Sequence, residues 1–191
     1  MYEYIRGTVA EATPAYAVVD AGGVGYYVQI SLQTFAAIEH AAEARLWVHY
    51  VVREDAQLLY GFATKEEREL FRLLIGVSGV GGNMARTILS TYSPSELRGI
   101  IATANASLLK NVKGLGLKTA QKILVELSGK LDALEAGTAQ APAAAAAEEA
   151  LQALVMLGFA KASAEKVLRG LAKEHAAASA EELIRMALKQ L

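Results

Sequence analysis

The chain has 191 residues, of which 53% are hydrophobic and 20% are charged, so it can bury a core and is not disordered as a whole. It has no cysteine, which excludes disulfides and thiolate metal sites, and no apolar run near the roughly 18 residues of a transmembrane helix. The net charge of −1 argues against a chain that is basic throughout, and three histidines far apart in sequence predict no metal site. The N-terminus alternates and carries charge, unlike a signal peptide, so we expect a cytoplasmic protein.

The first third of the chain predicts β-structure. Five short apolar or alternating segments are separated by turns, which is typical of a small antiparallel barrel. The predicted strands cover residues 2–10, 16–21, 24–31, 46–52 and 56–62. The segment between the third and fourth strands predicts a loop or a helical turn. We place the barrel at residues 1–63.

The middle third, residues 64–132, predicts helices in pieces of roughly 8–15 residues. Thr64 followed by Glu67 predicts a capping box at the start of the first helix. Ser93 followed by Glu96 predicts another helix start. This part of the chain therefore predicts an all-helical domain.

The last third predicts a linker and a small bundle. Residues 135–147 contain alanine, glycine and proline without a bulky apolar side chain, which predicts a flexible linker over 133–147. Residues 148–191 then predict three short amphipathic helices. The last two of these helices begin near Ser163 and Ser179, each followed by a glutamate.

A glycine-bracketed motif occurs twice in the middle third. VSGVGGNMARTIL (77–89) and VKGLGLKTAQKIL (112–124) match at an offset of 35 residues. Gly-x-Gly lets the backbone turn sharply, and the helix that begins there presents unpaired N–H groups at the positive end of its dipole. A phosphate can bind such amides. This helix-hairpin-helix pattern predicts binding to the backbone of duplex DNA, largely independent of sequence.

The charge distribution agrees with this prediction. Residues 1–62 carry three basic and seven acidic side chains, residues 63–131 carry ten and five, and residues 132–191 carry six and eight. The basic excess therefore coincides with the repeated motif, as expected for a polyanionic partner. A single copy could be a tight turn in any helical bundle, but two matched copies in the basic third favour DNA binding.

Neither glycine motif predicts a nucleotide cofactor. GVGGNMA lacks the glycine spacing and the preceding strand of a dinucleotide-binding fingerprint. GLGLKT lacks the Gly-Lys-Thr of an ATPase phosphate loop, because Leu117 intervenes. We expect no cofactor and no ATP hydrolysis.

The chain resembles the RuvA family of bacterial Holliday junction branch migration proteins over nearly its whole length. The resemblance is carried by GGVGYYV (22–28), VVREDAQLLYGF (51–62), both hairpins and LGF (157–159). It implies an oligonucleotide-binding-type (OB) barrel, a double helix-hairpin-helix domain, a linker and a three-helix domain like a ubiquitin-associated module. It also implies a non-catalytic homotetramer that holds four-way junctions open and recruits the hexameric RuvB ATPase. Whether two tetramers form an octamer, and whether the RuvC resolvase binds the other face, stay open.

The resemblance implies site residues as well. Two phosphate sites would comprise Gly79, Gly81, Gly82 and Asn83 in the first hairpin and Gly114, Gly116, Lys118 and Thr119 in the second, with Lys122 adding charge nearby. The first hairpin departs from the family pattern at Gly82-Asn83, where Pro-Lys is common. Because one cation is lost there, we expect a weaker first site.

Glu54 and Asp55 match the acidic pin of the family. In a tetramer, eight such carboxylates would repel phosphates at the centre of the junction and help to keep strands apart. From the residues alone, however, this pair predicts an ordinary solvated hairpin turn.

In the last domain, the resemblance implies a motor-binding hydrophobic patch around Leu157, Gly158 and Phe159, at the turn after the first helix. We expect Leu154 and Leu157 to belong to the core.

Two other functions fit parts of the sequence. A DNA glycosylase or lyase could use Lys118 in a similar hairpin, but the downstream Gly-Pro-Asp run of such enzymes is absent from the sequence. A protein-interaction adaptor would bind no DNA, and the basic middle third argues against it.

Overall fold

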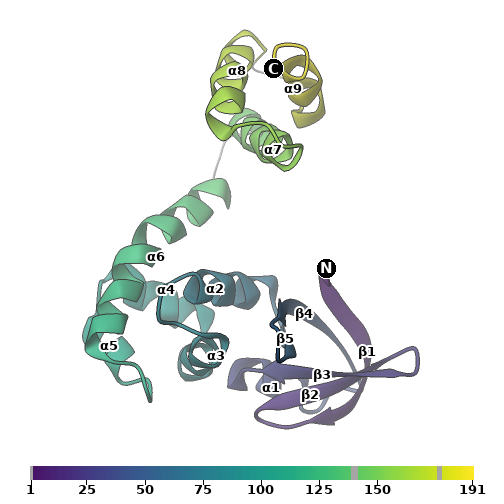
Figure 1. Cartoon of the computed structure of the whole chain (residues 1–191), viewed down its shortest axis with the longest axis vertical. Coiled ribbons are helices and arrows are strands. Elements are labelled where there is room, and N and C mark those ends of the chain that lie inside the picture. Colours follow the sequence, from purple (N-terminus) through teal and green to yellow (C-terminus); the bar gives the residue numbers. More distant parts are fainter. Residues whose placement is uncertain (1, 139–141, 176–177) are drawn as a thin grey trace. The chain divides into compact units, whose positions relative to one another are not determined.

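The computed structural model describes residues 2–138, 142–175 and 178–191 (Figure 1). The chain divides into two compact units, residues 1–131 and residues 132–191. The strands are β1 (Tyr4–Ala12), β2 (Tyr16–Ala21), β3 (Val24–Ile30), β4 (Glu43–Val52) and β5 (Gln57–Phe62). The helices are α1 (Leu32–Ile38), α2 (Lys65–Ile75), α3 (Gly82–Thr91), α4 (Pro94–Ala102), α5 (Ala106–Lys110), α6 (Leu117–Thr138), α7 (Pro142–Met156), α8 (Lys161–Glu174) and α9 (Ala180–Ala187).

The five strands close into a barrel with the order β1-β2-β3-β5-β4. Neighbouring strands are antiparallel except β3 and β5, which run parallel. Alternate side chains point inward and fill the barrel. The core of the barrel comprises Ile5, Ala17, Val19, Val28, Ile30, Ile38, Leu46 and Val48. The predicted five-stranded barrel is confirmed, and α1 occupies the segment between β3 and β4 that predicted a loop or a helical turn.

A second core lies among α2–α6 and includes Tyr60 and Phe62 of β5. The ring of Phe71 on α2 is fully buried, and its centroid lies 4.8 Å from that of Tyr60 and 4.9 Å from that of Phe62. Aromatic pairs at this spacing stabilise packing beyond the area they bury. The barrel and the helices that follow it are therefore joined by a packed apolar interface.

Buried polar groups reinforce this joint. Tyrosine aside, the buried polar or charged side chains among the described residues are Ser31, Thr34, Glu67 and Arg68. The Glu67 carboxylate accepts hydrogen bonds from the hydroxyls of Ser31 and Thr34, the latter at 2.8 Å. Arg68 donates to the carboxylate of Glu3 at 2.8 Å. Two consecutive residues of α2 thus bind the barrel at two places. The clamp, as this group is called from here on, comprises Glu3, Ser31, Thr34, Glu67 and Arg68.

The clamp changes the predicted cap of α2. Thr64 accepts a hydrogen bond from the Glu67 N–H at 3.1 Å, as predicted. The carboxylate of Glu67 does not complete the capping box, because it is bound by α1 instead. The capping box predicted at Ser93 and Glu96 is present in full.

The second unit is a bundle of α7, α8 and α9. Its core includes Leu151, Leu154, Leu168, Leu171 and Leu183. The predicted three-helix bundle is confirmed. The start of α9 is confirmed too, since Ser179 and Glu182 form a capping box, whereas α8 begins at Lys161, two residues before the predicted Ser163.

The predicted linker, 133–147, differs from the structure in its local conformation. Residues 133–138 belong to α6 and residues 142–147 belong to α7, while 139–141 lie outside the described residues. Alanine has the highest helix propensity of any residue, so an alanine-rich segment forms helix even without apolar side chains to bury.

Candidate nucleic-acid interface

Two hairpin turns, between α2 and α3 and between α5 and α6, have the same backbone hydrogen bonds. In the first turn the N–H groups of Val77, Val80 and Ala85 donate to the carbonyls of Leu74, Val77 and Gly81, at 3.0, 3.0 and 2.9 Å. In the second turn the N–H groups of Val112, Leu115 and Ala120 donate to those of Leu109, Val112 and Gly116, at 3.0, 3.0 and 2.9 Å. Burial repeats as well, since all six donors are at most 5% exposed. The repeat in the sequence is therefore a repeat in the structure.

The two glycines of each turn serve different purposes. Gly79 and Gly114 have φ of +93° and +86°, in the left-handed region where a side chain is strained. Gly81 has an ordinary φ of −89°, and a Cβ at Gly81 or Gly116 would meet no protein atom within 4 Å. Neither backbone conformation nor internal packing requires glycine at these second positions. A missing side chain there leaves the backbone open to close approach from outside.

Open helix N-termini follow these second glycines directly. α3 begins at Gly82 and has no side-chain cap, and α6 begins at Leu117. The first helical N–H groups with carbonyl partners belong to Ala85 and Ala120. The amides before them lie at the positive end of the helix dipole and suit an anion.

Basic side chains surround the second turn. Lys118 is exposed in the first turn of α6, and Thr119 beside it is half-buried. Lys122 lies one turn further along, with its amine 3.9 Å from the Glu126 carboxylate. Lys113 is also exposed in this turn. Sequence reasoning missed Lys113, although it lies inside the second motif, next to Gly114.

The first turn has no basic residue between positions 77 and 84. Asn83 is exposed, and its carbonyl accepts a hydrogen bond from the Thr87 hydroxyl at 2.9 Å. Gly82 packs against the barrel, where a Cβ would lie 2.5 Å from the hydroxyl oxygen of Tyr60. A side chain at position 82 would therefore have to displace the Tyr60 ring, a constraint that the sequence did not reveal.

The two turns lie next to each other. The terminal methyl of Met84, in the first turn of α3, would be 3.2 Å from a Cβ placed on Gly114. Both sets of open amides thus belong to one region of the first unit, as the predicted double site requires.

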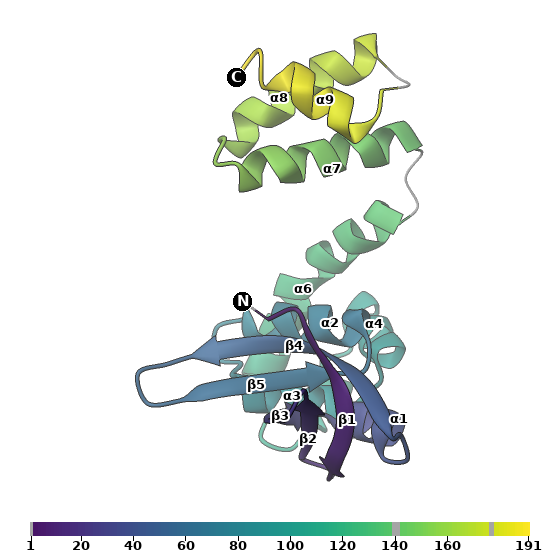
Figure 2. The ribbon, with the colours of Figure 1, turned by 90° about the vertical axis from the view of Figure 1, so that its right-hand side faces the viewer.

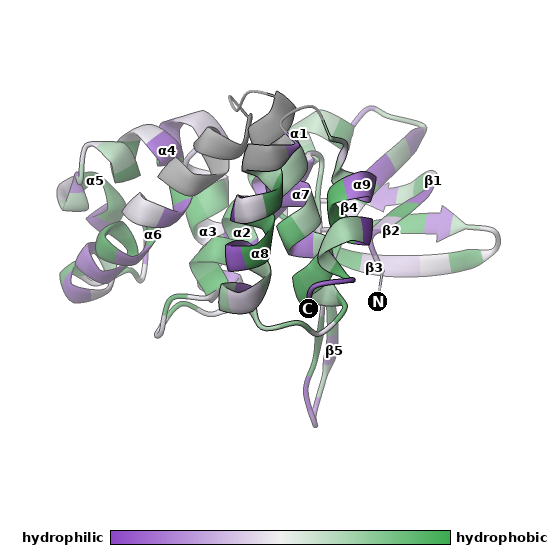
Figure 3. Ribbon diagram, turned by 90° about the horizontal axis from the view of Figure 1, so that it is seen from above, coloured by the Kyte–Doolittle hydropathy of each residue, from purple (hydrophilic) through white to green (hydrophobic). Residues whose placement is uncertain are grey.

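The β4–β5 hairpin projects from the barrel as a long arm (Figure 2). Its tip is closed by a hydrogen bond of 2.8 Å from the Arg53 N–H to the Ala56 carbonyl, and Glu54 and Asp55 between them are exposed. Figure 3 shows hydrophilic residues at the end of this arm. Neither carboxylate forms an ion pair with the residues that the structure describes.

The turn after α7 holds Leu157, Gly158 and Phe159. The Phe159 N–H donates to the Leu154 carbonyl at 3.1 Å and the Gly158 N–H to that of Val155 at 3.0 Å, with Gly158 at φ +98°. This is a Schellman cap, which needs glycine. Leu154 is fully buried as predicted, but the prediction of Leu157 as core is wrong, because the cap turns it outward and leaves it 62% exposed.

Leu157 forms part of an exposed apolar patch at the end of α7. The patch comprises Val155, Met156 and Leu157, which are 41%, 89% and 62% exposed. Phe159 is half-buried and packs on the core of the bundle. Exposed apolar residues in a contiguous run are a feature of protein-binding surfaces.

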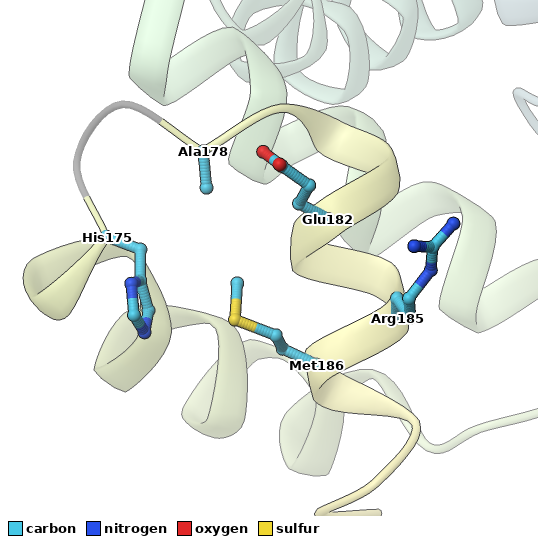
Figure 4. A pocket seen from close by; sticks show the side chains of 5 residues that line it. All are labelled: His175, Ala178, Glu182, Arg185 and Met186. Atoms are coloured by element: carbon cyan, nitrogen blue, oxygen red, sulfur yellow. The ribbon is translucent and has the colours of Figure 1, made fainter.

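A hollow of about 410 Å³ lies elsewhere on the same bundle, between α8 and α9 (Figure 4). His175, Ala178, Glu182, Arg185 and Met186 line it. The Glu182 carboxylate is already bound by Ser179, whose backbone N–H lowers the pKa of Glu182, and Arg185 is paired with Glu181 at 2.7 Å. Glu182 and Arg185 are therefore both engaged in contacts that stabilise α9.

Within the described residues, no group of three or more His, Cys, Asp or Glu could hold a metal ion. No described helix is long and apolar enough to cross a membrane.

A closed barrel, two tandem helix-hairpin-helix turns and a small three-helix bundle define a distinct class of multidomain protein. Three family models match the chain in the same order: RuvA N terminal domain at residues 1–61, SAM-like helix-hairpin-helix tandem at 71–128 and RuvA, C-terminal domain at 145–191.

Curated relatives match over the full length. The chain is 50% identical to the Holliday junction branch migration complex subunit RuvA of Bacteroides thetaiotaomicron, covering 100% of both chains. It is 45% identical to the protein of the same name from Porphyromonas gingivalis and 40% identical to that from Christiangramia forsetii, again with 100% of each chain covered. The chain belongs to the RuvA family.

Proposed function

We propose that this chain binds four-way DNA junctions by their phosphate backbone and acts as the non-catalytic DNA-binding subunit of a branch migration complex. The observation that carries the proposal is the pair of open helix starts after Gly81 and Gly116, where glycine serves neither conformation nor packing. A phosphate oxygen can approach these amides closely without contact to a base, so binding is independent of sequence. The names of the full-length relatives support a junction as the DNA substrate.

The proposed phosphate ligands are those named from the resemblance. They are Gly79, Gly81, Gly82, Asn83, Gly114, Gly116, Lys118, Thr119 and Lys122, and exposed Lys113 is proposed beside them. Asn83 supplies no charge, so the first site relies on amides and remains the weaker of the two.

The proposed assembly is a homotetramer, in which the four β4–β5 arms of the protein meet at the centre of the DNA junction. Glu54 and Asp55 lie at the tip of each arm, so eight carboxylates gather where strands exchange. Their repulsion of phosphates disfavours continuous duplex through the centre and holds the junction open. Two tetramers face to face would form an octamer.

The proposed partners follow from the same assembly. The exposed patch of Val155, Met156 and Leu157 is the docking site for the RuvB ATPase, which supplies ATP hydrolysis. RuvC would bind the face of the junction that the tetramer leaves free. In this proposal the chain itself has no active site and no cofactor and works in the cytoplasm. Its parts are the barrel (1–63), the hairpin domain (64–132), the connecting segment (133–147) and the motor-binding domain (148–191).

The test is the salt dependence of DNA binding by the full-length chain. A gel-shift titration against a synthetic four-way junction should give an affinity that falls linearly with salt on logarithmic axes, because bound phosphates release counterions. The double variant Lys118→Ala, Lys122→Ala should bind more weakly and with a shallower salt slope. An affinity independent of salt would exclude backbone binding and would favour the adaptor alternative.

A further inference from the structure

A hollow of about 410 Å³ lies between the base of the β4–β5 arm and the first hairpin. Its lining comprises His49, Tyr50, Val51, Val52, Arg53, Tyr60, Phe71, Ile75, Val80, Gly81 and Gly82. It therefore opens directly beside the start of α3, where the proposed first phosphate site lies. Burial lowers the pKa of His49, so its imidazole is neutral at pH 7 and brings no cation to this wall.

Tyr60 is an unusual member of this lining. Its side chain is only 3% exposed, yet its hydroxyl has no hydrogen-bond partner among the described residues. The hydroxyl oxygen would lie 2.5 Å from a Cβ on Gly82, so it sits against the first residue of α3. The ring is buried, but the hydroxyl oxygen is not one of the buried polar atoms that lack a partner among the described residues, so it keeps contact with solvent and is available to a ligand.

Three other tyrosines of the same unit have hydroxyl partners, whereas Tyr2, Tyr4, Tyr26 and Tyr27 lack one among the described residues but are more exposed than Tyr60. The hydroxyl of Tyr50, which lines the same hollow, donates to Gln57, that of Tyr16 donates to Glu11 at 2.7 Å, and that of Tyr92 donates to the Leu108 carbonyl at 2.6 Å. Tyr60 is more buried than any of these three, and its proton alone among the four is left for a ligand.

The first hairpin brings no cation of its own, although Arg53 of the β4–β5 arm lines the same hollow. Positions 77–84 carry no basic residue, and the nearest cation along the chain, Arg86, donates to the Ala15 carbonyl at 2.7 Å. An anion at the start of α3 would meet the open amides after Gly81 together with one free phenolic hydroxyl. Phosphate oxygens are strong acceptors for such a mixed set of backbone and hydroxyl donors.

We propose that the Tyr60 hydroxyl donates a hydrogen bond to a DNA phosphate bound at the first hairpin. The barrel, and not only the tandem hairpins, then supplies a ligand to this phosphate, and Gly82 is small so that the ring can reach it. This inference rests on the proposed function, because the phosphate belongs to the DNA that the hairpins bind.

The test compares Tyr60→Phe with Tyr50→Phe in the full-length chain. Both changes remove one hydroxyl from the same hollow and keep the ring, but only the Tyr60 hydroxyl is free. We expect Tyr60→Phe to weaken junction binding by at least about tenfold, the order expected for a hydrogen bond to a charged group. The salt slope should stay as in the wild type, because no cation is lost. Tyr50→Phe should bind as the wild type does.

A second measurement covers the possibility that Tyr60→Phe folds poorly. Placing 3-fluorotyrosine at position 60 keeps the size of the ring and makes the hydroxyl a stronger donor, so junction affinity should rise. Wild-type affinity for both changes at position 60 would overturn the inference while leaving the proposed function intact. A change in native mass with Tyr60→Phe would also overturn it, because the hydroxyl would then serve a subunit contact. Failure of the wild type to bind DNA would overturn the proposed function itself.

Discussion

Gly79 and Gly81 lie two residues apart in one turn, yet glycine is needed for backbone conformation only at position 79. Gly79 has φ of +93°, so Gly79→Ala places a side chain in the left-handed region and should destabilise the fold by about 1–2 kcal/mol. Gly81 has φ of −89° and open space beyond it, so Gly81→Ala should change stability by less than about 1 kcal/mol, because the poorer N-cap preference of alanine offsets the entropy it removes from the unfolded chain.

Junction affinity should distinguish the role of Gly81 from that of Gly79. Because a methyl on residue 81 stands where a phosphate would approach, Gly81→Ala should weaken junction binding although the stability of the protein stays close to that of the wild type. Urea unfolding and gel-shift titration measure the two quantities. If Gly81→Ala bound the junction as tightly as the wild type, the open backbone would not be the phosphate site.

At the scale of single elements, the clamp makes the attachment of α2 sensitive to pH. Burial raises the pKa of Glu67 above its ordinary value of 4.5, so the folded chain holds this proton more strongly than the unfolded chain. The stability that this group contributes is therefore present below pH 4.5 and is lost as pH rises through the folded pKa.

Glu67→Gln removes this titration and keeps the size of the side chain. The free energy of unfolding of the wild type, measured relative to Glu67→Gln, should fall as pH rises from 4 toward 7. Urea unfolding of both proteins at several pH values provides the comparison, and the other ionisable groups cancel in the difference. A difference that is independent of pH, or that grows with pH, would contradict the burial of an ionisable Glu67.

The end of α7 offers a matched pair of leucines. Leu154 is fully buried and Leu157 is 62% exposed. Leu154→Ala should cost about 2–5 kcal/mol of stability. Leu157→Ser should change stability by less than about 0.5 kcal/mol and weaken binding of the RuvB ATPase, as a pull-down would show. Undiminished ATPase binding by Leu157→Ser would place the docking site elsewhere.

The elements that the sequence predicted well are those whose signal is local. Strand alternation, the Ser93 cap and the repeated glycine motif depend on neighbours within a few residues, and the structure has them where the pattern placed them. The carboxylate of Glu67 was assigned to a local cap because its true partners, Ser31 and Thr34, lie more than 30 residues away in sequence.

The candidate site shows the same division. The turn glycines could be read from spacing, because helix geometry fixes where they fall. The packing of Gly82 on Tyr60 could not, since it depends on how β5 meets α3 in space. The outward direction of Leu157 depends on a Schellman cap, which the sequence LGF permits but does not by itself establish.

At the scale of the whole molecule, the acidic tips of the arms would act together in the proposed tetramer. One pair of carboxylates at Glu54 and Asp55 is weakly felt in water, whereas eight of them at one centre form a strong local field. Replacing both residues by Gln and Asn should leave junction affinity intact or raise it, measured by gel shift. A collapse of affinity would mean that the carboxylates attract part of the junction, contrary to the repulsion proposed here.

The most direct test of the central claim compares one junction with one duplex. The full-length chain is titrated against a synthetic four-way junction and against linear duplex of the same arm sequence, at two salt concentrations, and the ratio of the two dissociation constants is recorded. Recognition by four pairs of hairpins around a centre predicts a strong preference for the junction, with both affinities falling as salt rises. Equal, weak binding to both DNAs would contradict junction recognition and would mean that the hairpins bind the DNA backbone without preference for DNA structure.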